Sequence, residues 1–384
     1  MPIAAVPNYL GQDFTGASPG LRFGMFLPLW GRNNRTGELD WSAKDTNFRI
    51  TGRDREERQF KDDNKRGALD QAVCLTEADK KNLEAIIDRQ SVLSETIAKE
   101  QLLTIDAQSI APFTTGLGNE HPLENGFAFL WPYGLPYLPG SGVKGVLRQA
   151  ARELAADVTD DGIAQWESES DWSRAAIDAL FGNEDSNNAR RGALQFWDVI
   201  PNIAGHSLMV EVMTAHQAHY HQNGESPHES GQPNPINFLT VPPCSAFIFH
   251  VLCDRPFLTQ IAPELADGDR WKTLLQQVFE HAFAWLGFGA KTAVGYGAMA
   301  VDDQAVAARL ETEAEKRAEA ERQQEIAKKT AGLPDDAVWI ETQLLENAWS
   351  KNDLFLDAVE RIFEQHPVPS SEAQERLRGQ MDQR

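Results

Sequence analysis

The chain has 384 residues and a formal net charge of −21, with 36 lysines and arginines against 57 aspartates and glutamates. This balance excludes a free-standing nucleic-acid binder with a basic surface, so any such contact must be a local stripe or be completed by partner proteins. The 41% hydrophobic and 24% charged residues are typical of a globular protein with one large domain or two small ones.

The cysteines and the N-terminus bear on location. Cys74, Cys244 and Cys253 give an odd count without CxxC spacing, which indicates a reducing compartment and no zinc ribbon. The N-terminus lacks the basic and apolar regions of a secretory leader, and no apolar run approaches the roughly 20 residues that span a bilayer. We therefore expect a cytoplasmic protein with no membrane partner.

The first third of the chain combines one expected strand with helices. The apolar and aromatic segment Leu21–Trp30 (LRFGMFLPLW) predicts an early strand with a proline-marked end. The charged run Arg49–Arg66 indicates a solvated excursion from the fold. Apolar residues at spacings of three and four predict one or two helices over Glu77–Ile105. Glycine and proline then punctuate residues 114–118 and 131–140, which predicts loop and strand there.

A helix is expected over Val143–Asp157, with Ser141 as its N-cap. Lys144, Arg148 and Arg152 recur every four residues, so they form one basic stripe along this helix. A lysine in the first turn opposes the helix macrodipole, and Lys144 is therefore better explained by a bound anion than by helix stability. The alternative is a solvated lysine on a capped helix.

The second half of the core predicts a sheet with another main helix. The spacing of apolar residues over Trp271–Leu286 predicts that helix. Strands interspersed with two main helices favour an α+β, ferredoxin-like (RRM-type) sheet over a parallel doubly wound one. The expected strands are Gly192–Pro201, Leu208–Thr214, Ile236–Val241, Ala246–Cys253 and a closing strand, Ala298–Val301.

The composition changes near the end of the chain. Ala305–Lys329 consists almost entirely of helix-favouring polar residues and alanine, and Ala337–Gln365 predicts further helix after a break. We therefore expect a core domain over residues 1–301, with an insertion near 31–110, and a helical, acidic C-terminal extension over 302–384.

Two glycine-rich segments each hold one lysine: Leu138–Arg148 (LPGSGVKGVLR) and Gly287–Gly297 (GFGAKTAVGYG). Glycines let main-chain N–H groups approach an anion without interference from a Cβ, and Lys144 and Lys291 supply the countercharge. Each segment is therefore a candidate phosphate contact. The phosphate could belong to a nucleotide or to a nucleic-acid backbone.

Two enzyme classes share fragments of these motifs. A P-loop requires GxxxxGK[ST], but Ala290 stands before Lys291 and no strand precedes the loop. A serine acyl-enzyme would use Ser141-Gly-Val-Lys144, Ser186-Asn-Asn188 and Lys291-Thr-Ala293. The last of these lacks its expected glycine, and the chain lacks an export signal. The sequence favours neither class.

A histidine-rich stretch is the most enzyme-like constellation. His219 and His221, two residues apart, would share one side of a strand, and His216 adds a third imidazole for a metal ion. No acidic or fourth ligand accompanies them, so exposed histidines or contacts to RNA bases are the alternatives, and no cofactor is expected. Asp198 could act as a general base, or it could be a turn or cap residue.

Several motifs, taken in order, resemble the RAMP superfamily of CRISPR proteins. They are LPYLPGSGVKGVLRQAARE, GALQFWDVIP, PINFLTV and LGFGAKTAVGYGAM, and the resemblance covers Leu21–Val301. The stretch TGLGNEHPLENGFAFLWPYGLPYLPGSGVKG is more particular and resembles a subunit of the type III-B Cmr effector complex. The tail after Asp302 is not covered.

The resemblance implies a non-catalytic subunit that stacks with other Cmr subunits and holds guide (CRISPR) RNA and target RNA, while another subunit cuts the target. A metal-dependent ribonuclease using the histidines and a purely structural protein cap stay open as alternatives. The implied RNA contacts are Gly140, Ser141, Lys144, Gly145, Gly287, Gly289, Lys291, Thr292 and Gly295, together with Arg148 and Arg152 of the basic stripe and Tyr296 of the second glycine segment.

Overall fold

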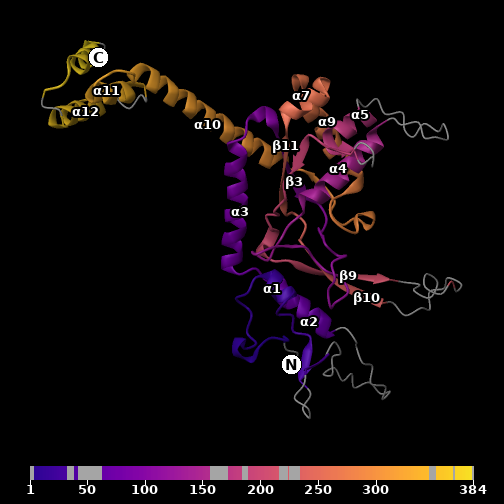
Figure 1. The fold of residues 1–384 in the computed structure, drawn as a ribbon. Coiled ribbons are helices and arrows are strands. Elements are labelled where there is room, and N and C mark those ends of the chain that lie inside the picture. Colours follow the sequence, from indigo (N-terminus) through magenta and orange to yellow (C-terminus); the bar gives the residue numbers. More distant parts are fainter. Residues whose placement is uncertain are drawn as a thin grey trace. The chain divides into compact units, whose positions relative to one another are not determined.

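A computed structural model describes residues 4–32, 39–41, 63–155, 172–183, 189–215, 224, 234–345, 352–365 and 368–382 (Figure 1). The chain divides into two compact units, Met1–Asp303 and Gln304–Arg384. The charged run Arg49–Arg66 falls largely outside the described residues. Within the described residues, no helix is both long enough and apolar enough to cross a lipid bilayer.

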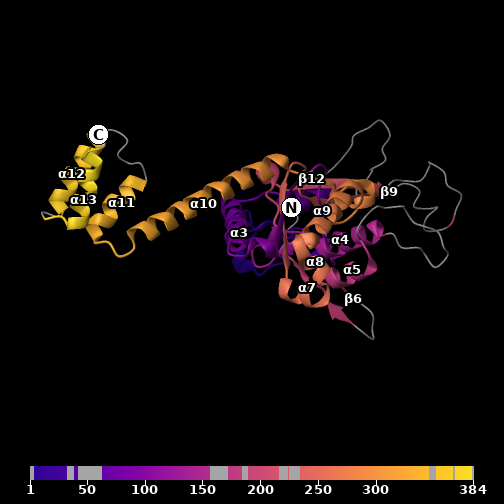
Figure 2. The ribbon, with the colours of Figure 1, turned by 90° about the horizontal axis from the view of Figure 1, so that it is seen from above.

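Four antiparallel strands form the main sheet of the first unit. Their order across the sheet is β12 (Met299–Val301), β3 (Leu102–Ser109), β11 (Ala246–Cys253) and β8 (Leu194–Phe196). Along the chain, α4 (Gly140–Leu154) stands between β3 and β8, and α9 (Arg270–His281) between β11 and β12. These two helices pack against each other (Figure 2). The predicted mixture of helices and antiparallel strands is confirmed.

The strand β11 shows how the sequence sets the core. Phe247, Phe249, Val251 and Cys253 alternate along it and are all buried, because residues at i and i+2 share one face of a strand. The ring of Phe249 lies 5.3 Å from that of Phe279 on α9. The strand was predicted with its correct bounds.

The three cysteines differ in environment, and this gives a test of the core. Cys253 is buried, and burial raises the pKa of its thiol to about 12, whereas Cys74 and Cys244 are exposed. Because the thiolate is the reactive form, we expect Cys253 to react about a thousandfold more slowly than the other two with an aromatic disulfide reagent at pH 8. Titration of the native chain should give two fast thiols, and urea should release the third. Three equally fast thiols would contradict this packing.

A long antiparallel hairpin forms a separate pair of strands in the first unit. It consists of β9 (Met209–Ala215) and β10 (Asn234–Thr240), with Met209 opposite Thr240 at its base. Phe113 and Val241 exchange two backbone hydrogen bonds just beyond β10, of 2.9 and 2.7 Å. The remaining short elements are β1 (Trp30–Arg32), β2 (Leu39–Trp41), β4 (Phe129–Leu130), β5 (Leu135–Pro136), α5 (Arg174–Phe181), β6 (Gly182–Asn183), β7 (Arg190–Arg191), α7 (Arg255–Ile261) and α8 (Pro263–Ala266).

The predicted strand Leu21–Trp30 is wrong. The segment begins inside helix α1 (Pro19–Phe23) and reaches a strand only at Trp30, the first residue of β1. Pro19 stands at the first helical position, where its fixed φ favours a helix start. Arg22 is buried and makes three hydrogen bonds to backbone carbonyls, so tertiary contacts override the β-favouring composition.

The helical prediction over Glu77–Ile105 is correct only in its first part. Helix α3 (Glu77–Glu95) starts at a capping box, in which Thr76 and Asp79 satisfy each other's backbone N–H groups. The chain then enters β3 at Leu102, which is a central strand of the main sheet. Strand β3 thus lies within the range 31–110 in which an insertion was expected. Helix α2 (Asp63–Ala72) precedes α3.

The second unit consists of helices. Helix α10 (Asp303–Thr330) has no buried residue and carries three ion pairs at i and i+4 spacing, which explains how a helix without an apolar face is stabilised. The predicted helix over Ala337–Gln365 is two helices, α11 (Asp335–Leu345) and α12 (Asn352–Gln365). Helix α13 (Ser371–Asp382) lies in the extension that was expected to be helical, although no bounds were predicted for it.

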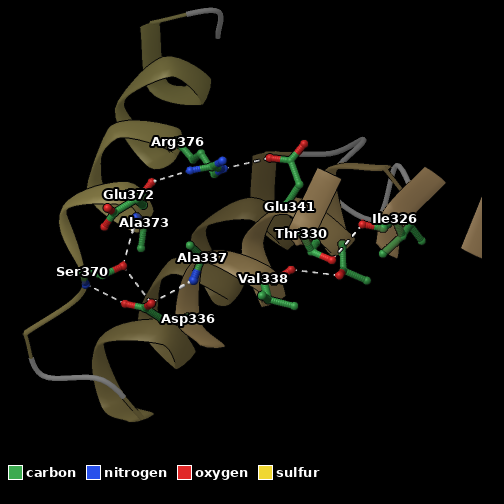
Figure 3. A network of polar contacts seen from close by, with 11 residues as sticks. Ile326, Thr330, Asp336, Ala337, Val338, Glu341, Ser370, Glu372, Ala373 and Arg376 are labelled. Atoms are coloured by element: carbon green, nitrogen blue, oxygen red, sulfur yellow. Dashed lines mark hydrogen bonds and ion pairs between the residues drawn. The ribbon is translucent and has the colours of Figure 1, made fainter. Parts of the chain in front are cut away.

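Polar side chains tie the ends of α11 and α13 together (Figure 3). Asp336 is buried, and its carboxylate accepts hydrogen bonds from the backbone N–H and the hydroxyl of Ser370, at 2.6 and 2.8 Å. The Ser370 hydroxyl in turn accepts from the Ala373 N–H, so it caps α13. Arg376 pairs with Glu341 at 2.9 Å. The unit thus has internal polar ties as well as an apolar core of its own.

Candidate nucleic-acid interface

A carboxylate of the protein itself binds the N-terminus of α4. The Gly140 N–H donates to Oδ1 of Asp198 at 2.7 Å, so Asp198 caps the helix, which is one of the two roles expected for it. A Cβ on Gly140 would lie 2.2 Å from the Phe196 carbonyl oxygen. Gly140 therefore permits close packing of α4 on the segment after β8. Its N–H already donates to Asp198, so it is not available to an anion.

The helix also begins earlier than predicted, and this changes the positions of two candidate residues. Because α4 starts at Gly140 instead of Val143, Ser141 lies inside the first turn and is not the N-cap. Lys144 falls in the second turn, so the argument that it opposes the macrodipole in the first turn does not apply. Ser141 and Gly145 are exposed, and Lys144 is half-buried.

The residues of the basic stripe of α4 differ in their surroundings, because one binds the protein and another is exposed to solvent. Nη2 of Arg148 donates to the Gly182 carbonyl at 3.1 Å, which ties α4 to the start of β6. Arg152, one turn further on, is exposed. The neighbouring Glu153 pairs with His281 at the end of α9, at 2.7 Å. Lys144 and Arg152 are thus the stripe residues best placed to meet a ligand.

The second glycine segment forms a loop whose inner side is fixed by the protein. A π-helix, η5 (Ala282–Leu286), leads into it and packs against α4. A Cβ on Gly289 would lie 2.3 Å from the Thr114 carbonyl oxygen, and one on Gly297 would lie 1.8 Å from the Phe288 carbonyl oxygen. The amides of Phe288, Ala290 and Gly297 donate to carbonyls of Gly297, Thr114 and Pro112. These glycines serve the fold of the loop.

The outer side of the same loop is open. Thr292–Val294 form a short 3-10 helix, η6, that ends at Gly295, whose φ is 96°. Gly295 is exposed, and a Cβ there would meet no atom within 4 Å. The outer turn, which we define as residues 292–295, is therefore the part of the loop that a phosphate could approach.

Lys291 and Tyr296 fasten the loop to the β9–β10 hairpin. Nζ of Lys291 lies 5.4 Å from the centre of the Phe238 ring and 3.4 Å from Sδ of Met213. Tyr296 packs edge-on against Phe238, with ring centroids 5.4 Å apart. Partial burial, with the charge of Glu211 and a hydrogen bond to it, raises the pKa of the Tyr296 hydroxyl. Both residues, expected to touch RNA, have protein partners.

Two exposed features were missed by sequence reasoning. Trp285 is 79% exposed on η5, directly before the glycine loop. An exposed tryptophan offers a face on which nucleic-acid bases can stack. No signal in the sequence marks it as exposed, because Trp285 stands three residues after the buried Ala282 and so continues the spacing of the buried side chains over Trp271–Ala282. Arg190, exposed on β7, adds a cation close in the chain to Gly182.

The candidate metal ligands cannot be placed. His216, His219 and His221 lie outside the described residues, as does the SxN fragment Ser186–Asn188. Within the part of the chain that is described, no three side chains of histidine, cysteine, aspartate or glutamate gather as metal ligands would.

Comparisons with known proteins find relatives of this chain. The chain is 28% identical to the CRISPR system Cmr subunit Cmr6 of Pyrococcus furiosus over an alignment of 229 residues, with coverage of 47% of this chain and 63% of that protein. The chain thus spans less than two thirds of that relative's length.

Solved structures are similar over comparable stretches. A type III-B Cmr-beta complex bound to cognate target RNA matches with a TM-score of 0.40 and 19% identity, over 57% of this chain and 66% of that one. The crystal structure of Cmr6 from Pyrococcus furiosus matches with a TM-score of 0.32 and 24% identity, over 54% and 100%.

The family is given by a match to the core of the first unit. The family model of the RAMP superfamily covers residues 106–300, half of the chain. This range runs from within β3 to within β12 and holds both glycine segments, whereas α10 to α13 lie beyond it. The chain belongs to the RAMP superfamily.

Proposed function

We propose that this chain is a non-catalytic, RNA-binding subunit of a type III-B CRISPR (Cmr) effector complex, equivalent to the sixth subunit. Membership of the RAMP superfamily and the similarity to Cmr6 support the assignment. In this proposal the main sheet is ferredoxin-like, because the succession β3-α4-β8-β11-α9-β12 corresponds to that motif. The chain caps the backbone built by other Cmr subunits, in the cytoplasm.

The observation that best supports RNA contact is the outer turn of the glycine loop, residues 292–295. Its ends are held by backbone hydrogen bonds, while Gly295 leaves the main chain uncovered toward solvent. Such a turn can approach phosphate and 2′-hydroxyl groups, which are the same for every guide sequence. Lys144 and Arg152 supply the positive charge in this proposal, since Arg148 and Lys291 are engaged within the protein.

Target cutting is assigned to another subunit in the proposal. Asp198, which the sequence offered as a general base, is engaged as the cap of α4. The net charge of −21 also argues that the chain meets RNA over a small area, with neighbouring subunits completing the groove.

The test uses the reconstituted complex and a charge-matched pair of variants. The double variant Lys144→Ala/Arg152→Ala should bind guide RNA about tenfold more weakly, and should lower the slope of log affinity against log salt by about 1.4 for two lost single-strand phosphate contacts. Lys81→Ala/Arg89→Ala is the control, because it removes two cations with the same eight-residue spacing on helix α3. Filter binding at several salt concentrations measures both quantities.

Equal slopes for the two variants would reject the assignment of Lys144 and Arg152. The alternative functions predict other results. A metal-dependent ribonuclease would show stoichiometric metal and chelator-sensitive cutting by the purified chain alone. A purely structural cap would give no crosslink from the outer turn, residues 292–295, to guide or target RNA in the assembled complex.

A further inference from the structure

Helix α12 presents two apolar faces, although the core of the second unit uses only one. Phe355, Ala358 and Ile362 are buried in that core. Leu356 and Phe363 are 59% and 49% exposed. They are seven residues apart and therefore lie on one side of the helix, with the half-buried Val359 between them in sequence. We call Leu356, Val359 and Phe363 the apolar ridge.

An acidic edge runs beside this ridge. Glu360 and Glu364 each follow a ridge residue by one position, and both are exposed. At 100° per residue they lie on the solvent side of the ridge, away from the buried face of α12. We call Glu360 and Glu364 the acidic rail. The whole segment 304–384 is acidic too, with 11 basic and 17 acidic residues.

Val359 packs partly against the core of the unit, whereas Leu356 and Phe363 lie outside that core. The ties from Asp336 to Ser370 and from Glu341 to Arg376 also hold the helices together without these two side chains (Figure 3). An exposed apolar stripe bordered by charge is a common mark of a protein-binding surface.

We propose that the ridge and rail bind a basic amphipathic helix of another protein. Apolar residues of such a helix, at spacings of three, four and seven, would pack on the ridge, and its lysines or arginines would pair with Glu360 and Glu364. The negative charge of the rail favours a basic helix over RNA or a second copy of this chain. The rail repels RNA phosphates, and a second copy of this chain would bring two acidic rails together. The surface lies outside residues 106–300, so the inference does not depend on the RNA-binding proposal.

The first test of the ridge uses the full chain and a fluorescein-labelled peptide with leucines at helical spacing and lysines elsewhere. Leu356→Ser/Phe363→Ser should weaken binding at least about tenfold in fluorescence anisotropy, because two apolar side chains lose their contacts. Val92→Ser/Leu93→Ser is the matched control, since these residues of α3 are 62% and 52% exposed. It should change binding less than about twofold. Equal losses would overturn the proposal.

The second test separates the rail from the general acidity of the chain. Glu360→Gln/Glu364→Gln should weaken peptide binding about threefold to tenfold, and more at low salt than at high salt. Glu315→Gln/Glu319→Gln removes the same charge with the same spacing from exposed positions of α10, and should have little effect. The rail variants keep the apolar contacts, so they test the proposal even if the serine variants unfold.

Two other outcomes would reject the proposed occupant. Light scattering that reports a dimer, broken by the ridge variant, would make a second copy the partner. Single-stranded RNA that competes with the peptide, and that itself loses affinity in the ridge variant, would make nucleic acid the ligand. Equal effects of both glutamate pairs would leave only attraction between a basic peptide and an acidic protein, and would overturn the assignment of the rail.

Discussion

Replacing Gly297 with alanine is expected to lower the free energy of unfolding by about 2 to 5 kcal/mol. Two costs combine at this position. The φ of Gly297 is 69°, which strains a residue with a Cβ, and that Cβ would lie 1.8 Å from the Phe288 carbonyl oxygen. The obstacle is backbone that is itself hydrogen-bonded, since the Phe288 N–H donates to the Gly297 carbonyl at 2.9 Å. The loop therefore cannot move aside cheaply.

Gly295→Ala is the matched control, because it shares the positive φ but not the crowding. Its φ is 96°, and a Cβ there would meet nothing within 4 Å. The expected cost is about 1 kcal/mol, from backbone strain alone. Urea unfolding followed by tryptophan fluorescence compares the two variants. Similar costs would mean that the Gly297 backbone is not packed against Phe288.

This contrast bears on how glycine-rich motifs are interpreted. The sequence located both segments, and it could suggest phosphate contact from glycines beside lysines. It could not tell which amides the protein uses itself, because their partners, Asp198 for Gly140 and Thr114 for Ala290, are distant in the chain. The motif thus combines residues required for folding with a smaller outer turn that is open to a ligand.

The same limit applies to the charged candidates. Helical spacing placed Lys144, Arg148 and Arg152 on one stripe, and α4 has that stripe. Spacing within one helix could not reveal the Gly182 carbonyl, which binds Arg148 from another element. Likewise, the Phe238 ring and the Met213 sulfur that contact Lys291 come from the β9–β10 hairpin. These roles depend on tertiary contacts.

The fold shows the same difference between features set by local spacing and features set by tertiary contacts. Helices α4 and α9 were predicted because their apolar residues recur at helical spacing, and strand β11 was predicted with its correct bounds. The segment 21–30 was misassigned because it is apolar without a clear period, and because the contacts that make it helical come from the end of α2. The C-terminal helix α13 has few apolar residues, and its N-cap works through Asp336, 34 residues earlier.

Replacing Arg22 with alanine is expected to lower the free energy of unfolding by about 3 to 5 kcal/mol. Arg22 is only 6% exposed. Its Nε donates to the Ala17 carbonyl at 2.8 Å, and its two Nη atoms donate to the carbonyls of Gln71 and Cys74. Alanine would leave these acceptors without a donor in a buried setting. Burial lowers the pKa of the Arg22 guanidinium, and its bonds to three carbonyls compensate for the lost solvation.

Loss of Arg22 should also destabilise the base of the β9–β10 hairpin. The Val73 carbonyl, beside the Cys74 carbonyl that Arg22 binds, accepts a hydrogen bond from the Leu208 N–H at 2.9 Å, and Cys74 pairs with Ser207. We therefore expect the Leu208 amide to exchange with solvent faster in Arg22→Ala than in Arg89→Ala, which removes an exposed arginine of α3. Hydrogen exchange read by mass spectrometry measures this.

Equal protection of the Leu208 amide in both variants would mean that Arg22 stabilises only α1. Faster exchange of this amide in Arg22→Ala would instead mean that contacts at two places hold the hairpin. Arg22 would act at its base through residues 73 and 74, and Tyr296 of the glycine loop would act further along, through Phe238 and Glu211. The position of the outer turn, residues 292–295, would then depend on a buried arginine outside the proposed interface. A variant far from the glycine loop would in that case weaken the proposed RNA binding by displacing the hairpin that contacts the loop.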